Sequence, residues 1–131
     1  MGQQQLLLIV LGVIIVGIAV VVGINVFTAS SLTANNDAVI SDVMTIGSMA
    51  QQYYRKPAAM GGGGNTFTGF AVPKSLEKTA NMSTAVSAAV TATKVTLTAK
   101  GTEKNSAGTD LTIVFDVWAD SMKVNSTNVN L

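Results

Sequence analysis

The most restrictive feature of this sequence is an apolar run without a single ionisable side chain. Leu6 to Phe27 is 22 residues long and contains only apolar residues, glycines and Asn25. A helix of that length extends roughly 33 Å, enough to cross a bilayer core of about 30 Å. Because only a helix satisfies the backbone of a single segment in lipid, the many Val and Ile residues do not favour a strand here. The run therefore predicts a membrane-spanning helix.

The composition of the chain excludes most catalytic and cofactor classes. The 131 residues are 48% hydrophobic and 11% charged, with a mean hydropathy of +0.44. There is no cysteine and no histidine, which argues against disulfides, thiolate zinc sites, Fe–S clusters and imidazole-based catalysis. The net charge of +1 gives no electrostatic basis for binding nucleic acid. We therefore expect a protein that is not an enzyme and has no cofactor, no metal site and no nucleic-acid partner.

The first residues lack the positive charge that normally precedes an N-terminal apolar segment. Met1 to Gln5 reads MGQQQ, and the 8 basic and 7 acidic residues of the chain all lie at or after Asp37. Secretory signal peptides begin with basic residues and have a shorter apolar run of about 7 to 15 residues. Membrane anchors normally carry basic residues on their cytoplasmic side. We therefore expect that a basic leader has been removed and that Met1 is a processed N-terminus.

Beyond the apolar run the pattern becomes one-sided. No proline occurs between Thr28 and Pro57, and apolar residues recur at spacings of four and three: Val39, Val43, Ile46, Ala50 and Tyr53. This spacing is typical of an amphipathic helix with one buried face. Pro57 and the four glycines from Gly61 to Gly64 are expected to end it. The sequence thus predicts one helix of about 50 residues, apolar all round in its first half and one-sided in its second.

The C-terminal half predicts a small antiparallel sheet. The glycines are expected to form a flexible connector, and Pro73–Lys78 a short helix. Alternation of apolar and polar residues predicts four strands, with a polar loop at residues 101–110: residues 86–90, 95–99, 111–118 and 122–125. The expected fold is α+β, with the long helix packed on the sheet. Its parts are a transmembrane helix (1–27), an amphipathic continuation (28–57), a Gly-rich connector with a short helix (58–80) and a sheet head (81–131).

These features together resemble a known family. Met1, a short polar stretch and the run LLLIVLGVIIVGIAV lead into a long helix and a small C-terminal sheet, and this arrangement is similar to that of a mature type IV pilin. The resemblance is specific over about the first 30 residues and architectural over the rest. It implies that a prepilin peptidase removes a basic leader, that Met1 is N-methylated, and that the subunit waits in the cytoplasmic membrane. The pilus assembly machinery would then extract it into a helical homopolymer at the cell surface.

The resemblance also implies which residues pack in the core of that filament. They lie on the apolar helix and its polar start: Gln5, Leu6, Leu7, Val10, Val13, Ile14, Gly17, Val21 and Gly23. The family usually has a glutamate where this chain has Gln5, and the acid neutralises the terminal amine of a neighbouring subunit. The amides of Gln3, Gln4 and Gln5 can accept hydrogen bonds from an amine but carry no charge. The cysteine pair of many pilins is also absent.

Other functions remain open at this level. The chain could be a pseudopilin or minor pilin of a secretion or pilus machine, a protein with a simple membrane anchor, or a binding or enzymatic domain on a membrane stalk. Two N-glycosylation patterns, which begin at Asn81 and Asn125, are short enough to occur by chance. The glycines of the apolar helix are equally consistent with close helix packing and with ordinary membrane-helix glycines. Asp110, Asp116 and Asp120 are interpreted as surface carboxylates rather than a calcium site.

Overall fold

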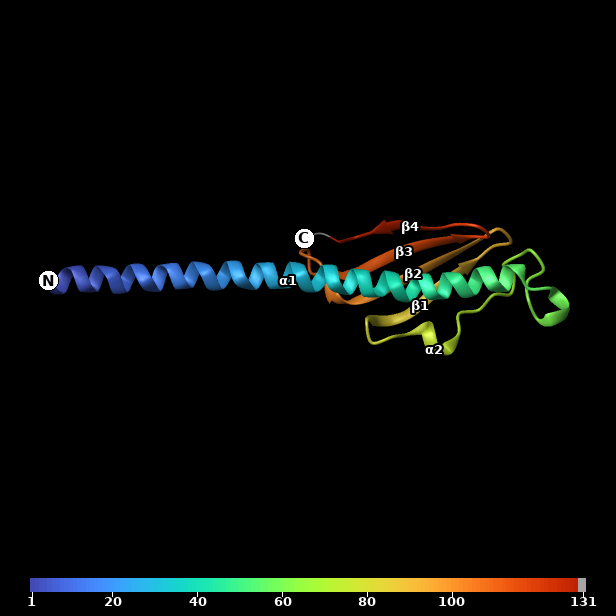
Figure 1. Cartoon of the computed structure of the whole chain (residues 1–131), viewed down its shortest axis with the longest axis horizontal. Helices are drawn as coiled ribbons and strands as arrows, with labels where there is room; N and C mark the ends of the chain where they lie inside the picture. Colours follow the sequence, from blue (N-terminus) through green and yellow to red (C-terminus); the bar gives the residue numbers. More distant parts are fainter. Residues whose placement is uncertain (130–131) are drawn as a thin grey trace. The chain divides into compact units, whose positions relative to one another are not determined.

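The long helix predicted from the sequence is present. The computed structural model describes residues 1–129, and its first element, α1, runs from Gly2 to Arg55 (Figure 1). The remaining elements follow in the order η1 (Ala58–Met60), α2 (Lys74–Glu77), β1 (Met82–Val90), β2 (Lys94–Lys104), β3 (Asp110–Trp118) and β4 (Met122–Thr127). The chain divides into two compact units, Met1–Ser31 and Leu32 onward. The first unit is the apolar half of α1, and the second holds the rest of α1 and all four strands.

The four strands form one antiparallel sheet in the order β1-β2-β3-β4 (Figure 1). Consecutive strands are neighbours, as in the meander that the alternation predicted. The regular pairings run from Ser87 opposite Thr98 to Val90 opposite Val95 and from Lys94 opposite Trp118 to Lys100 opposite Thr112. The expected α+β fold class, a long helix packed on a small antiparallel sheet, is confirmed.

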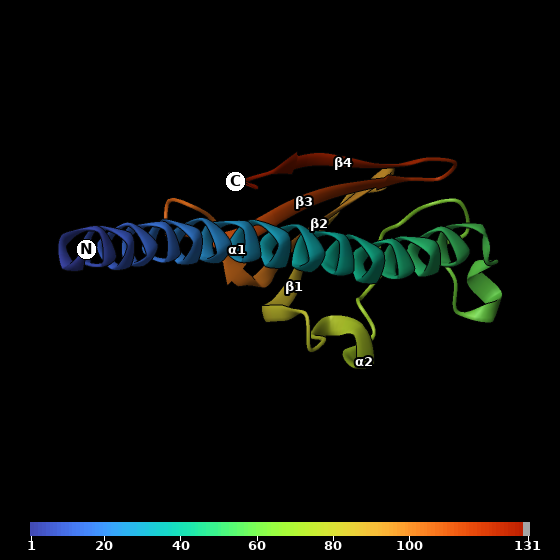
Figure 2. The same ribbon diagram turned by 60° about the vertical axis from the view of Figure 1, so that its left-hand side comes forward.

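The core lies between one face of the sheet and one face of α1. Figure 2 shows the strands along one side of the second half of α1. Val39, Val43, Ile46 and Ala50, four members of the predicted stripe, are fully buried. From the sheet, the fully buried side chains are Val95, Leu97, Ala99, Leu111, Ile113 and Val117. The head therefore has a hydrophobic core of its own, built from the amphipathic half of the helix and alternate residues of the strands.

The predicted polar loop at residues 101–110 is wrong over its first part. Gly101 pairs with Met82 of β1, and β2 continues as far as Lys104. The Asn35 side chain on α1 supports this extension, since its Oδ1 accepts a hydrogen bond from the Glu103 backbone N–H at 3.2 Å. The real loop is short and closes around Asn105, whose backbone N–H donates to the Thr109 carbonyl at 2.9 Å. Polar composition indicated a loop, but a long-range partner made the segment a strand.

The glycine run caps the helix instead of forming an extended connector. Pro57 has no N–H and cannot continue α1, so the last carbonyls of the helix need other donors. The N–H groups of Gly63, Gly64 and Asn65 supply them by donating to the carbonyls of Tyr53, Lys56 and Tyr54 at 2.8 Å, 3.0 Å and 2.8 Å. A Cβ at Gly63 would collide with the Thr66 carbonyl, so this close approach requires glycine.

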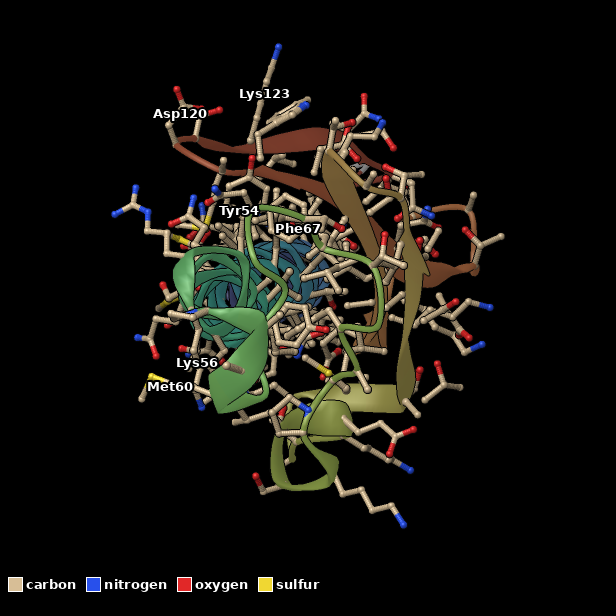
Figure 3. The ribbon with its side chains drawn as sticks, turned by 90° about the vertical axis from the view of Figure 1, so that its right-hand side faces the viewer. Tyr54, Lys56, Met60, Phe67, Asp120 and Lys123 are labelled. Atoms are coloured by element: carbon tan, nitrogen blue, oxygen red, sulfur yellow. The ribbon has the colours of Figure 1, made fainter. Side chains whose placement is uncertain are left out.

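Aromatic side chains close the core at this end of the helix. Phe67, in the segment after the glycines, is fully buried, and its ring centroid lies 4.7 Å from that of Tyr54. Figure 3 shows both side chains pointing inward between α1 and the strands. The Tyr53 ring lies 5.7 Å from Phe70, and its hydroxyl donates to the Thr68 carbonyl at 2.9 Å. Both tyrosines therefore have packing roles, as the sequence indicated.

Candidate functional site

The most prominent candidate site is the surface of the apolar helix, Leu6–Phe27. Every residue of this segment is exposed, and its large hydrophobic side chains are between 53% exposed at Leu11 and 74% exposed at Phe27. Burying one such side chain contributes about 1.5–3 kcal/mol, so so large an apolar surface in water is strongly unfavourable. An apolar environment from outside the chain, either lipid or protein, must cover it.

The length of the helix fits the first of these environments. α1 is long and apolar enough to cross a membrane, by length and composition. Its N-terminal turn contains no acidic residue, and Gln3, Gln4 and Gln5 are exposed there. Within residues 1–129, no carboxylate in the first turn of α1 is therefore available to neutralise the Met1 amine. Gln5 itself is held in the helix by its N–H, which donates to the Met1 carbonyl at 3.4 Å.

The predicted assembly residues share this surface but do not all share one face. Since each residue advances about 100° around the helix, spacings of four and three keep side chains on one stripe. Leu6, Val10, Val13, Gly17 and Val21 follow that spacing and lie on one face of α1. Leu7 and Ile14 lie on its flank, whereas Gly23 falls on the opposite side. A partner that covers the Val13 face therefore does not cover Gly23.

The glycines of the apolar helix have no intrachain explanation. A Cβ added at Gly12, Gly17 or Gly23 would meet nothing within 4 Å. A glycine inside a helix costs about 0.5–1 kcal/mol relative to alanine, and no contact of the described residues offsets this cost. The two explanations that the sequence left open, close packing on another helix and ordinary use in a membrane helix, both place the reason outside the chain.

The carboxylates of the head have separate structural partners. Asp116 lies 3.7 Å from the Lys94 ammonium and accepts a hydrogen bond from the Thr96 hydroxyl at 2.8 Å. Asp110 lies 3.2 Å from the Lys104 ammonium, and Asp120 is exposed. Over the described part of the chain, no group of three or more acidic side chains is positioned to hold a metal ion.

An open hollow of about 330 Å³ lies near the end of α1, lined in part by Met49, Gln52, Tyr53, Lys56 and Phe70. Lys56 is its one charged side chain, and Figure 3 shows it on the outside of the helix. A cation without a neighbouring acid or nucleophile does not make a pair for acid–base or covalent catalysis. The hollow therefore offers no catalytic arrangement.

The two glycosylation patterns differ in structure. The Asn81 side chain donates from Nδ2 to the Asp42 carboxylate at 3.1 Å, and the Ser83 hydroxyl of the same pattern is buried without a hydrogen-bond partner in the described residues. Asn125 is exposed. It also occupies a bulge in β4, because Val124 and Ser126 pair with adjacent residues of β3. Only the second pattern presents a free asparagine side chain in the folded head.

Comparison with models of known protein families, with characterised proteins and with solved structures found no match. The arrangement of a long apolar N-terminal helix and a small antiparallel sheet is compatible with a pilin fold. The sequence identified the apolar surface correctly because it depends on composition alone. Sequence reasoning did not find the Asp42 network or the burial of Phe67, since both depend on contacts between distant segments.

Proposed function

We propose that this chain is a structural subunit of an extracellular type IV pilus-like filament, polymerised through its N-terminal helix. The observation that carries the proposal is the complete exposure of Leu6–Phe27 in a chain whose head has its own core. A head that is already folded does not need this helix for stability. The helix is then free to be covered first by the cytoplasmic membrane and later by copies of itself in a filament.

The energetics of the two environments support such a transfer. Lipid tails and an apolar helix bundle are similarly apolar, so moving the helix between them does not expose it to water. In the bundle, close packing and the loss of lipid contacts decide the balance, and small residues allow helices to approach closely. Gly12, Gly17 and Gly23 provide such positions with open space around them. The same surface that anchors the subunit thus becomes the core of the polymer.

The first test is direct observation of the polymer. Material sheared from cells that express the chain is imaged by electron microscopy, and its filaments are identified by peptide mass fingerprinting. A major subunit should dominate these filaments. Filaments that contain the chain only in traces would instead favour the pseudopilin or minor-pilin function. A chain confined to the membrane fraction in cells that make no filaments would favour a simple anchor and contradict the proposal.

A pair of aspartate variants then tests the helix itself. Val13→Asp places a carboxylate on the apolar face, where a buried unpaired charge costs several kcal/mol per subunit. We expect this variant to abolish filaments. Thr45→Asp is the matched control, because Thr45 is exposed on the second half of α1, away from the core. The control should assemble normally, and normal yield from Val13→Asp would show that this face is not packed in the filament.

A further inference from the structure

Asn25 is the one polar side chain inside the apolar helix, Leu6–Phe27. It is exposed, and within residues 1–129 its side chain takes part in no hydrogen bond. The nearby Thr28 differs in this respect, since its hydroxyl donates to the Ile24 carbonyl at 2.9 Å. In a dry environment an amide left without a partner costs about 1–3 kcal/mol. Asn25 therefore needs a polar partner from outside the chain once the helix is covered by protein.

The helix offers few groups that could be this partner in a second copy. Between Met1 and Ile24 the only polar side chains are Gln3, Gln4 and Gln5 at the helix start, and all three are exposed. A primary amide contains both donors and an acceptor, so a glutamine can satisfy an asparagine completely. Any neighbour that presents residues 6–24 to Asn25 leaves the amide against apolar side chains or glycine.

Helix geometry selects one of the three glutamines. Asn25 follows Gln5 by 20 residues, which corresponds to about 30 Å along the axis and about 200° around it. Gln5 and Asn25 therefore point in nearly opposite directions on the same helix. Two parallel copies in the same rotational orientation, shifted axially by about 30 Å, place Gln5 of one directly opposite Asn25 of the other. Gln4 and Gln3 lie about 300° and 40° from Asn25 and do not face it in this arrangement.

We propose that neighbouring subunits in the filament pack in parallel with this stagger, so that the Gln5 amide of one copy pairs with the Asn25 amide of the next. The inference rests on the proposed function and adds the register of the polymer to it. The stagger brings polar groups together at one level and leaves apolar residues facing apolar residues along the rest of the shared length. A single buried polar contact of this kind fixes register in other helical assemblies, because shifted alternatives leave it unpaired.

The chain contains no cysteine, so disulfide cross-linking can test the register without a background. The test variant combines Gln5→Cys with Asn25→Cys, and the control combines Gln5→Cys with Ile18→Cys. Ile18 lies seven residues before Asn25, almost two full turns, so it faces the same side at a level about 10 Å closer to Gln5. Sheared filaments of both variants are oxidised and separated on a non-reducing gel.

We expect the Gln5–Asn25 variant to give a ladder of multimers on the order of tenfold stronger than the control, because a disulfide requires Cα atoms within about 7 Å. Filaments in which the control pair cross-links and the test pair does not would overturn the stagger and leave the proposed function intact. A wild-type chain that forms no filaments would overturn the function, and the register with it.

A second measurement covers the case in which the cysteine variants do not assemble. A density map of wild-type filaments gives the position of Asn25 relative to every neighbouring helix. Gln5 of an adjacent copy within hydrogen-bond distance of Asn25 supports the register. An Asn25 side chain surrounded by the apolar residues of its neighbours contradicts it, even when the filament itself is present.

Discussion

Gly47 lies where α1 comes closest to the sheet, and replacing it with alanine sets two opposing effects against each other. In an ordinary helix interior, Gly→Ala stabilises by about 0.5–1 kcal/mol because alanine restricts the unfolded backbone. At Gly47 the added Cβ would lie 2.7 Å from the Met122 sulfur, 3.1 Å from Val117 Cγ2 and 3.5 Å from Phe115 Cε1. The first two distances are shorter than carbon and sulfur atoms tolerate, so the sheet must move or the side chains must change rotamer.

The clash is expected to outweigh the helix propensity. Met122 is only half-buried and can move its sulfur, but Val117 is fully buried and its branched side chain has one preferred rotamer. Overpacking of this kind typically costs about 1–3 kcal/mol. The net result for Gly47→Ala is a loss of about 1 kcal/mol. For a head of this size, that loss corresponds to a decrease in Tm of about 4–8 °C.

Thermal unfolding of the full chain in detergent, followed by near-UV circular dichroism, measures this loss. Gly12→Ala is the control, since a Cβ there meets nothing within 4 Å and the Tm of the head should not change. Combining Gly47→Ala with Met122→Ala removes one colliding group, so the two changes together should cost less than their sum. An increase in Tm for Gly47→Ala alone would refute the reasoning, because it would mean that the helix and sheet are not in close contact at Gly47.

Three further outcomes are expected. Asp42→Ala should lower the free energy of unfolding by about 1–3 kcal/mol in a denaturant titration, because Asp42 accepts hydrogen bonds from Thr79 at 2.6 Å and from Asn81 at 3.1 Å; an unchanged midpoint would contradict this role. Purified folded protein treated with an oligosaccharyltransferase and a lipid-linked glycan should gain mass at Asn125 and not at Asn81, as peptide mapping would show, and modification at Asn81 alone would reverse this assignment. Gln5→Ala should lose filaments while Gln5→Glu retains them, because the terminal amine needs an acceptor in a dry bundle; full assembly of the alanine variant, seen by electron microscopy, would make Gln5 a passive position.

Local patterns in the sequence were sufficient for the elements of the fold. The stripe from Val39 to Ala50 predicted the buried face of α1, since a helix places residues at spacings of three and four on one side. Pro57 predicted its end because proline has no N–H to donate. Alternation predicted the strands for the same kind of reason, a fixed side-chain period of two. None of these inferences needs to know which segments meet in space.

The tertiary structure decided what these segments contact. Gly101 belongs to a strand and not to a loop because Met82 pairs with it and Asn35 supports the neighbouring Glu103, and no local pattern encodes either contact. Phe67 is fully buried only because the glycine cap turns the chain back toward Tyr54. The apolar helix is the opposite case. Leu6–Phe27 has no tertiary contact to modify it, so the sequence alone determined its character, and its partner must come from outside the chain.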